Sequence, residues 1–190
     1  MRTRETAFLA ITLFLSLSLT QAAKAQCVYP ITSTFGVADN FSLSTPDPVP
    51  YNPALPQFVA FLNGTGLPTN KMKTFDNQAI NRHMVATLRH GLRHCFSGAT
   101  SLKLCFRARA GLGSQNDAVY IYNTNFTNNT FPVIFSSAIT PALIPSWSPG
   151  TTATLCINLT SQMTSNQIGD MLQFRVEDDT AVDFIKMTLQ

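Results

Sequence analysis

The chain has 190 residues, of which 45% are hydrophobic and 12% charged, and its formal net charge is +3. Residues 1–25 contain three of the 13 basic residues and one of the 10 acidic residues, so the remaining 165 residues carry 10 basic and 9 acidic residues, a net charge of +1. This balance excludes a strongly basic nucleic-acid-binding protein, while the length suffices for one domain with a sizeable core.

The first 25 residues are a predicted signal peptide. Arg2 and Arg4 precede the apolar run 7–19, and small residues follow as far as Ala25, which is the pattern of a cleavable secretory signal. The alternative is a membrane anchor, but the run is barely long enough to span a bilayer and is interrupted by Thr and Ser. We therefore expect a secreted or cell-surface protein that begins at Gln26 and has no membrane span after cleavage.

Four cysteines follow the cleavage site: Cys27, Cys95, Cys105 and Cys156. An even set in an oxidising compartment predicts two disulfides, and the spacing matches no zinc or redox motif. Of the three possible connectivities, we favour Cys105 with Cys156, because both take the outward parity of their predicted strands. This leaves Cys27 with Cys95.

Five Asn-X-Ser/Thr triplets are predicted glycan acceptors in a eukaryotic secretory pathway. Their asparagines are Asn40, Asn63, Asn125, Asn128 and Asn158. Chance also produces such triplets in an Asn- and Thr-rich chain, and a bacterium would not use them in this way. They favour a glycosylated surface protein without establishing one.

Residues 26–70 are expected to form one weak strand, Ala38 to Leu43, and a proline-rich arm. Five prolines in residues 46–56 exclude a helix or a central strand there, because proline fixes φ and lacks the N–H donor. Residues 71–190 are expected to form the β-sandwich domain.

The segment 80–94 has two interpretations. Ile80, Met84, Leu88 and Leu92 recur every four residues as on a helix, whereas Met84, Ala86 and Leu88 alternate as on a strand. We favour a strand at His83–Arg89. A helix would instead bring His90 and His94 one turn apart, as in a zinc site.

Alternation of apolar and polar residues dominates the rest of the chain. The predicted strands are residues 102–109, 119–122, 131–139, 155–159, 172–177 and 183–189, with a short helical piece within 161–170. Short strands at this spacing, separated by turns, predict an all-β fold: an antiparallel two-sheet sandwich, jelly-roll-like, with the proline-rich arm at its N-terminus.

Three pieces carry a resemblance: SLKLCFRARAG with SQNDAVYIYN, then SWSPGTTATLCINL, then VEDDTAVDFIKMTL. In this order they resemble the β-sandwich domain of secreted bacterial surface proteins of the exosortase-sorted (PEP-CTERM) kind, over roughly residues 80–190. Asp178 to Asp183 is the most specific part. The resemblance implies a fold and an extracellular setting, and it implies no activity; the sorting tail usual in such proteins is not seen here.

The acidic turn near the C-terminus is a predicted calcium site. Four carboxylates within seven residues repel one another unless a cation lies among them, and calcium takes six to eight oxygen ligands. The predicted ligands are Asp179 and Asp183, with Asn116 and Asp117 from another turn. Alternatively, these carboxylates accept hydrogen bonds from turn amides and pair with arginines, namely Arg107, Arg109 or Arg175, which requires no metal.

Aromatic and basic residues suggest a carbohydrate-binding surface. Tyr120 and Tyr122 share one strand face beside Asn123, Trp147 lies in a proline-flanked loop, and rings of this kind can stack on sugars. The basic strand adds Arg107 and Arg109 as contacts. In the alternative, the tyrosines are ordinary sheet-surface residues and the tryptophan fills the edge of the core.

The sequence contains no GxSxG, HExxH or P-loop motif, so we expect no enzyme. The predicted function is a secreted non-catalytic surface or extracellular-matrix module that binds a polysaccharide or glycoprotein at a cell surface, with calcium as a structural ion. The alternative is a structural or protein-interaction subunit, and a secreted glycan hydrolase is the third hypothesis.

Overall fold

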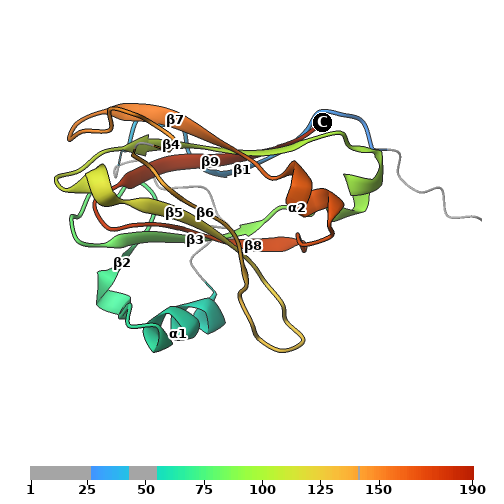
Figure 1. The fold of residues 1–190 in the computed structure, drawn as a ribbon, viewed down its shortest axis with the longest axis horizontal. Helices are drawn as coiled ribbons and strands as arrows, with labels where there is room; N and C mark the ends of the chain where they lie inside the picture. Colours follow the sequence, from blue (N-terminus) through green and yellow to red (C-terminus); the bar gives the residue numbers. More distant parts are fainter. Residues whose placement is uncertain (1–26, 43–54, 141) are drawn as a thin grey trace, which may run out of the picture.

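The computed structural model describes residues 27–42, 55–140 and 142–190, which form two facing sheets (Figure 1). One sheet has the strand order β1-β9-β4-β7 and the other the order β2-β3-β8-β5-β6. The strands are β1 (Ile31–Gly36), β2 (Met72–Lys73), β3 (His83–Arg89), β4 (Leu102–Arg109), β5 (Ala118–Asn123), β6 (Val133–Ala138), β7 (Thr152–Asn158), β8 (Met171–Val176) and β9 (Ala181–Leu189). The helices are α1 (Pro56–Gly64) and α2 (Thr160–Thr164), with 3-10 turns η1 (Thr69–Lys71), η2 (Arg93–Gly98) and η3 (Ser114–Asn116).

The strand order is that of a jelly roll. The short β2 pairs in parallel with β3, and all the other paired strands are antiparallel. Without β2, each sheet has four strands, and the chain passes repeatedly from one sheet to the other, as in the jelly-roll architecture. The predicted all-β, jelly-roll-like sandwich is therefore confirmed.

The core lies between the two sheets and follows the predicted alternation. On β4, Leu102, Leu104 and Phe106 are fully buried, while the residues between them are more exposed. The ring of Phe106 meets that of Phe174 on β8, edge to face, with centroids 5.1 Å apart. Rows of this kind on both inner faces produce the dry layer that holds the sheets together.

Segment 83–89 is a strand, as predicted, and not a helix. It pairs with β8 from Met84 opposite Val176 to Arg89 opposite Met171. His90 directly follows this strand and His94 lies in η2. The helical spacing needed for the alternative zinc site is therefore absent.

Helix α1 was not predicted. Pro56 is its first residue, where the missing N–H of proline costs nothing. Phe58 and Leu62, four residues apart, are buried on the outer face of the five-stranded sheet, below which α1 lies in Figure 1. The two-residue period of strand 172–177 places Gln173 on the outer face, opposite Leu172 and Phe174. Because α1 covers this face, Gln173 is fully buried, and it accepts a hydrogen bond from Thr87 at 2.7 Å.

The N-terminal strand differs from the prediction. The structure has a strand at Ile31–Gly36, which pairs with β9, and bends at residues 39–41 in place of a strand. Asn40 and Phe41 have φ of +67° and +64°, a left-handed backbone that does not continue a strand. Most of the proline-rich segment, residues 43–54, lies outside the described residues, as does the predicted signal peptide.

Both predicted disulfides are present. Cys105 and Cys156 face each other across β4 and β7, with Cα atoms 4.0 Å apart. Cys27 pairs with Cys95, with Cα atoms 5.7 Å apart, and so attaches the segment before β1 to η2. Within the described ranges, no helix is long and apolar enough to cross a membrane.

Candidate functional site: a donor-rich cleft and two carboxylate groups

The predicted calcium ligands lie in two different groups of carboxylates. Asp117 and Asp179 are grouped with Asp178, and Asp183 is grouped with Asp39 and Asp76. Within each group, one carboxylate oxygen from each residue lies within 4.8 Å of the others. Asn116, the fourth predicted ligand, is exposed and belongs to neither group.

Asp183 is diverted from the core by a β-bulge. Arg107 lies opposite Phe184 and Ala108 opposite Val182, so Asp183 has no partner residue on β4. Its Oδ1 accepts hydrogen bonds from the backbone N–H groups of Asp39 and Phe41 (3.3 and 3.2 Å), and its Oδ2 is 3.1 Å from Nη1 of Arg107. This carboxylate holds the bend after β1, as the alternative without a metal expects.

The group around Asp117 joins the β8–β9 turn to the start of β5. Asp117 Oδ2 accepts hydrogen bonds from the Asp179 N–H at 3.1 Å and the Thr180 hydroxyl at 2.7 Å. Asp179 Oδ1 accepts one from the Asn81 N–H at 2.8 Å. The three residues of this group therefore belong to turns that the backbone already holds in place.

Burial dominates the electrostatics at this end of the molecule. It raises the pKa of Asp117 to about 6, with the neighbouring Asp178 adding to the rise and the Thr180 hydroxyl opposing it. Burial likewise lowers the pKa of Lys73 to about 8, although Asp117, Asp179 and Asp178 favour its charged form. The Lys73 ammonium donates to the backbone carbonyls of Ala79 and Asp178, at 2.9 and 3.0 Å.

The residues predicted to contact sugar do not share an exposed surface. Tyr122 is 4% exposed because α1 covers it, and Trp147 is 2% exposed within the core. Neither ring is open for stacking on a sugar, and the alternative role of the tryptophan as a core residue is what the structure shows. Tyr120, half-buried, packs beside Tyr122.

Arg107 and Arg109 are already engaged on the other sheet. The Arg109 guanidinium lies 4.2 Å from the centroid of the Phe41 ring, and Arg107 lies 5.7 Å from it. Both donate to Oδ1 of Asn40, at 3.2 Å from Arg107 and 3.5 Å from Arg109. These contacts hold the bend after β1 against the outer face of the four-stranded sheet, apart from the tyrosines.

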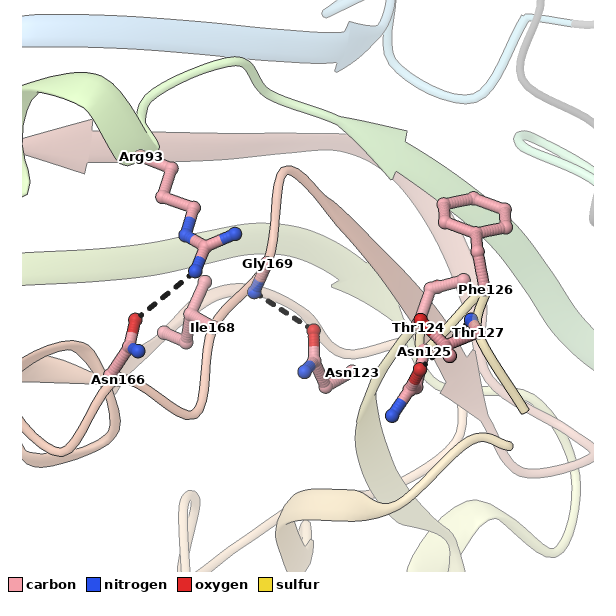
Figure 2. A pocket seen from close by; sticks show the side chains of 9 residues that line it. All are labelled: Arg93, Asn123, Thr124, Asn125, Phe126, Thr127, Asn166, Ile168 and Gly169. Carbon is pink, nitrogen blue, oxygen red and sulfur yellow. Dashed lines mark hydrogen bonds between the residues drawn. The ribbon is translucent and has the colours of Figure 1, made fainter. Parts of the chain in front are cut away.

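A solvent-open cleft lies at the other end of β5 and β8 from the carboxylates of Asp117 and Asp179. Its volume is about 290 Å³, near the lower end of cavities that hold small ligands, roughly 300–1,000 Å³. The β5–β6 loop, the α2–β8 loop and η2 contribute its walls (Figure 2). The lining residues are Arg93, Asn123, Thr124, Asn125, Phe126, Thr127, Asn166, Ile168 and Gly169.

Three asparagine amides in the cleft have their acceptor atoms engaged and their donor groups free. Oδ1 of Asn123 accepts from the Gly169 N–H (2.9 Å), and Oδ1 of Asn125 accepts from the Thr127 N–H (3.0 Å). Oδ1 of Asn166 accepts from Nη2 of Arg93 (3.4 Å). Each partner is a donor, which fixes the orientation of the amide. The Nδ2 groups therefore have no hydrogen-bond acceptor within the described part of the chain.

The rim of the cleft carries an exposed aromatic ring. Phe126 is 63% exposed, one of the few large apolar side chains in the described ranges with that much access to water. Figure 2 shows it in the β5–β6 loop, beside Thr124 and Asn125. A ring that is exposed next to free amide donors has the composition of a sugar-binding surface.

Of the cleft residues, sequence reasoning named Asn123 as a polar neighbour of the sugar-binding tyrosines and Asn125 as a glycan acceptor. The walls of the cleft come from segments up to 76 residues apart, from Arg93 to Gly169, so no local spacing marks them. The Asn-rich run 123–129 was the available signal, because amides cluster there.

The five sequon asparagines are all exposed. Asn125 is special because its Nδ2 is both a free donor of the cleft and the atom to which an N-glycan would be attached. A glycan on Asn125 would occupy the cleft, so the two roles exclude each other. The remaining predicted acceptors, Asn40, Asn63, Asn128 and Asn158, lie outside the cleft lining.

No family model matches the chain, and no curated protein matches it. Among solved structures, the xylan-binding module CBM15 is similar at 10% identity and a TM-score of 0.36, over 55% of this chain and 69% of that one. The K1 cleaved adhesin domain of Lys-gingipain from Porphyromonas gingivalis W83 is similar at 15% identity and a TM-score of 0.28, over 57% of this chain and 62% of that one. Neither likeness is close enough to bear on function.

Proposed function

We propose that this protein is a secreted, non-catalytic carbohydrate-binding module whose binding site is the cleft lined by Arg93, Asn123, Asn125, Phe126 and Asn166. The observation that carries the proposal is the set of free donors in the cleft: three amide Nδ2 groups and a guanidinium, beside an exposed ring. Sugars present hydroxyl and ring oxygens to such donors and an apolar face to such a ring.

The arginine points to the class of sugar. Arg93 is exposed and uses one guanidinium nitrogen for Asn166, which leaves further N–H groups for a ligand. Guanidinium groups bind carboxylates through paired, charge-assisted hydrogen bonds. A polysaccharide that contains uronic acids therefore fits the cleft better than a neutral one.

The setting is part of the proposal. An N-terminal segment with the pattern of a signal peptide and two disulfides support an extracellular location. The resemblance to secreted bacterial surface proteins supports the same setting and remains a prediction.

Binding is tested by pull-down and calorimetry with unglycosylated protein from a bacterial host, using polygalacturonate, alginate and xylan. Asn166 has a left-handed backbone (φ +56°), which aspartate also tolerates. Asn166→Asp therefore keeps the acceptor for Arg93 but replaces the two N–H donors of the amide with a second acceptor. Phe126→Ala removes the ring. We expect Phe126→Ala to weaken binding by roughly 0.5–1.5 kcal/mol, a twofold to tenfold loss, and Asn166→Asp to weaken it at least as much.

The matched control is Leu112→Ala, which removes another exposed apolar side chain, 67% exposed and absent from the cleft lining. Binding of Leu112→Ala should equal that of the unchanged protein. If no polysaccharide binds, or if Leu112→Ala loses as much affinity as Phe126→Ala, the cleft is not a glycan site. The structural or protein-interaction role then takes its place.

A further inference from the structure

The carboxyl groups of Asp117, Asp178 and Asp179 concentrate negative charge at the end of β5 and β8 opposite the cleft. Each offers an oxygen within 4.8 Å of the other two. Two ion pairs join side chains of the described residues, Arg107 with Asp183 and Arg175 with Glu177, and neither involves this group. In the group that contains Asp183, one carboxylate is thus paired with an arginine, whereas no such ion pair is present in the described structure for Asp117, Asp178 or Asp179.

The Lys73 ammonium compensates only part of the charge. Lys73 is buried, but its ammonium is hydrogen-bonded to two backbone carbonyls and forms no ion pair with these carboxylates in the described structure. Three carboxylates and one ammonium leave a formal charge of −2. One divalent cation would balance that charge.

A second observation points to a ligand. Asp117 is 1% exposed, and its Oδ1 is buried with no hydrogen-bond partner among the described residues, while Oδ2 already accepts two hydrogen bonds. A buried carboxylate oxygen loses its hydrogen bonds to water, and here no protein donor replaces them in the described contacts. A bound metal ion would supply the missing partner.

The surrounding turns fix the third carboxylate without help from a cation. Oδ2 of Asp179 lies against Gly113, where a Cβ would come within 2.4 Å of it, and Gly113 has φ +88°. Oδ1 of the same residue is held by the Asn81 N–H. Asp179 is therefore positioned by backbone from two other loops, and a cation would meet a preformed set of oxygens.

We propose that Asp117, Asp178 and Asp179 bind one calcium ion. All three supply carboxylate oxygens, the hard donors that calcium prefers, and Asp178 is partly exposed, so that water can complete the six to eight ligands. This assignment replaces Asp183 and Asn116 of the sequence-based set with Asp178. The ion would hold the β8–β9 turn against β5, a role separate from glycan binding in the cleft.

The experiment is calorimetric titration of the EDTA-treated, dialysed protein with calcium chloride, followed by thermal unfolding. One calcium ion should bind per chain, and calcium at one hundred times its dissociation constant should raise the midpoint by several degrees. Asp178→Asn, in the partly exposed position, should weaken binding at least tenfold. Asp178→Ser is the second variant if Asp178→Asn unfolds in EDTA.

The matched control is Asp39→Asn, a carboxylate of the group that contains Asp183, whose Oδ1 accepts from the Ser42 N–H and would be retained. Asp39→Asn should bind calcium like the unchanged protein. Absence of saturable binding at millimolar calcium, or loss in Asp39→Asn with retention in Asp178→Asn, would overturn the proposal. Glycan binding by Asp178→Asn should be unchanged, so the two proposals fail or succeed separately.

Discussion

His90 is a buried, neutral side chain with one ring nitrogen in use. Its Nδ1 accepts a hydrogen bond from the Leu92 N–H at 3.1 Å, while Nε2 is buried and has no hydrogen-bond partner within the described ranges. Burial lowers the pKa of His90 to about 4, against the opposing effect of Asp170. The unfolded chain has the ordinary value near 6.5, so protonation below that pH favours unfolding.

We therefore expect His90 to make stability depend on pH. Its contribution is complete above pH 6.5 and is lost as the pH falls to about 4, by at most about 3 kcal/mol. His90→Asn keeps an acceptor for the Leu92 N–H but does not titrate. Thermal unfolding from pH 7 to 4.5 should show a larger fall in midpoint for the unchanged protein than for the variant.

His83 serves as an internal control in that comparison. Burial and the nearby Arg175 lower its pKa to about 4 as well, but it is only half-buried and is present in both proteins. Its contribution therefore cancels in the difference. Parallel pH profiles for the two proteins would show that His90 is not the source of the dependence.

Helix α1 is an added layer outside the sandwich, and Phe58 is its main anchor. The Phe58 ring is fully buried, with centroids 5.0 Å from Tyr122 and 5.1 Å from Phe131. Phe58→Ala should reduce the free energy of unfolding by about 3–5 kcal/mol, because it removes a large side chain from a covered site. Urea unfolding measures the change.

The control for α1 is its exposed neighbour, Gln57→Ala, which should change stability by less than about 0.5 kcal/mol. A second measurement is hydrogen exchange on β8, which α1 shields at Gln173. Exchange should speed up in Phe58→Ala and remain unchanged in Gln57→Ala. Equal stability of both variants would mean that α1 does not stabilise the sandwich.

Elements with a sustained two-residue period were predictable from the sequence, and the others were not. On β4 a run of eight residues alternates between inner and outer positions, so local physics alone selects the strand and its buried face. Helix α1 has nine residues and begins at Pro56, the last of five prolines in residues 46–56. A proline-rich segment argues against a helix, so this short helix was not predicted. Gln173 alternates like a solvent-exposed residue, and no local sequence signal indicates that a helix covers it.

The candidate sites were predictable in composition but not in arrangement. The carboxylates of the β8–β9 turn were recognised, but a bulge at Asp183 separates that residue from Asp179, and a bulge leaves no local signal. The cleft joins Arg93, the β5–β6 loop and Gly169, which meet only because the jelly roll brings them to one end of the sheet. Such long-range contacts depend on the topology of the fold, which cannot be predicted from the spacing of residues along the chain.

At the scale of the molecule, β5 and β8 separate two kinds of chemistry. The loops after β5 and before β8 form the donor-rich cleft, and the turns before β5 and after β8 hold the Asp117 carboxylate group. Because β5 and β8 are adjacent and antiparallel, the end of β5 lies beside the start of β8, and the start of β5 lies beside the end of β8. A ligand at one end and an ion at the other can thus be removed independently.

The two disulfides close loops that do not overlap in sequence, with separations of 68 and 51 residues. In the chain-entropy model, each disulfide stabilises the fold by roughly 4 kcal/mol, and the two values are similar because the dependence on loop length is logarithmic.

Removal of either disulfide should lower the free energy of unfolding in urea by about that amount. The two double variants are Cys27→Ala with Cys95→Ala, and Cys105→Ala with Cys156→Ala. Since the loops are independent, the losses should add in the fourfold variant, to an amount comparable with the whole stability of a typical domain. We expect that variant to be largely unfolded at room temperature, and a fourfold variant as stable as either double variant would contradict the additive account.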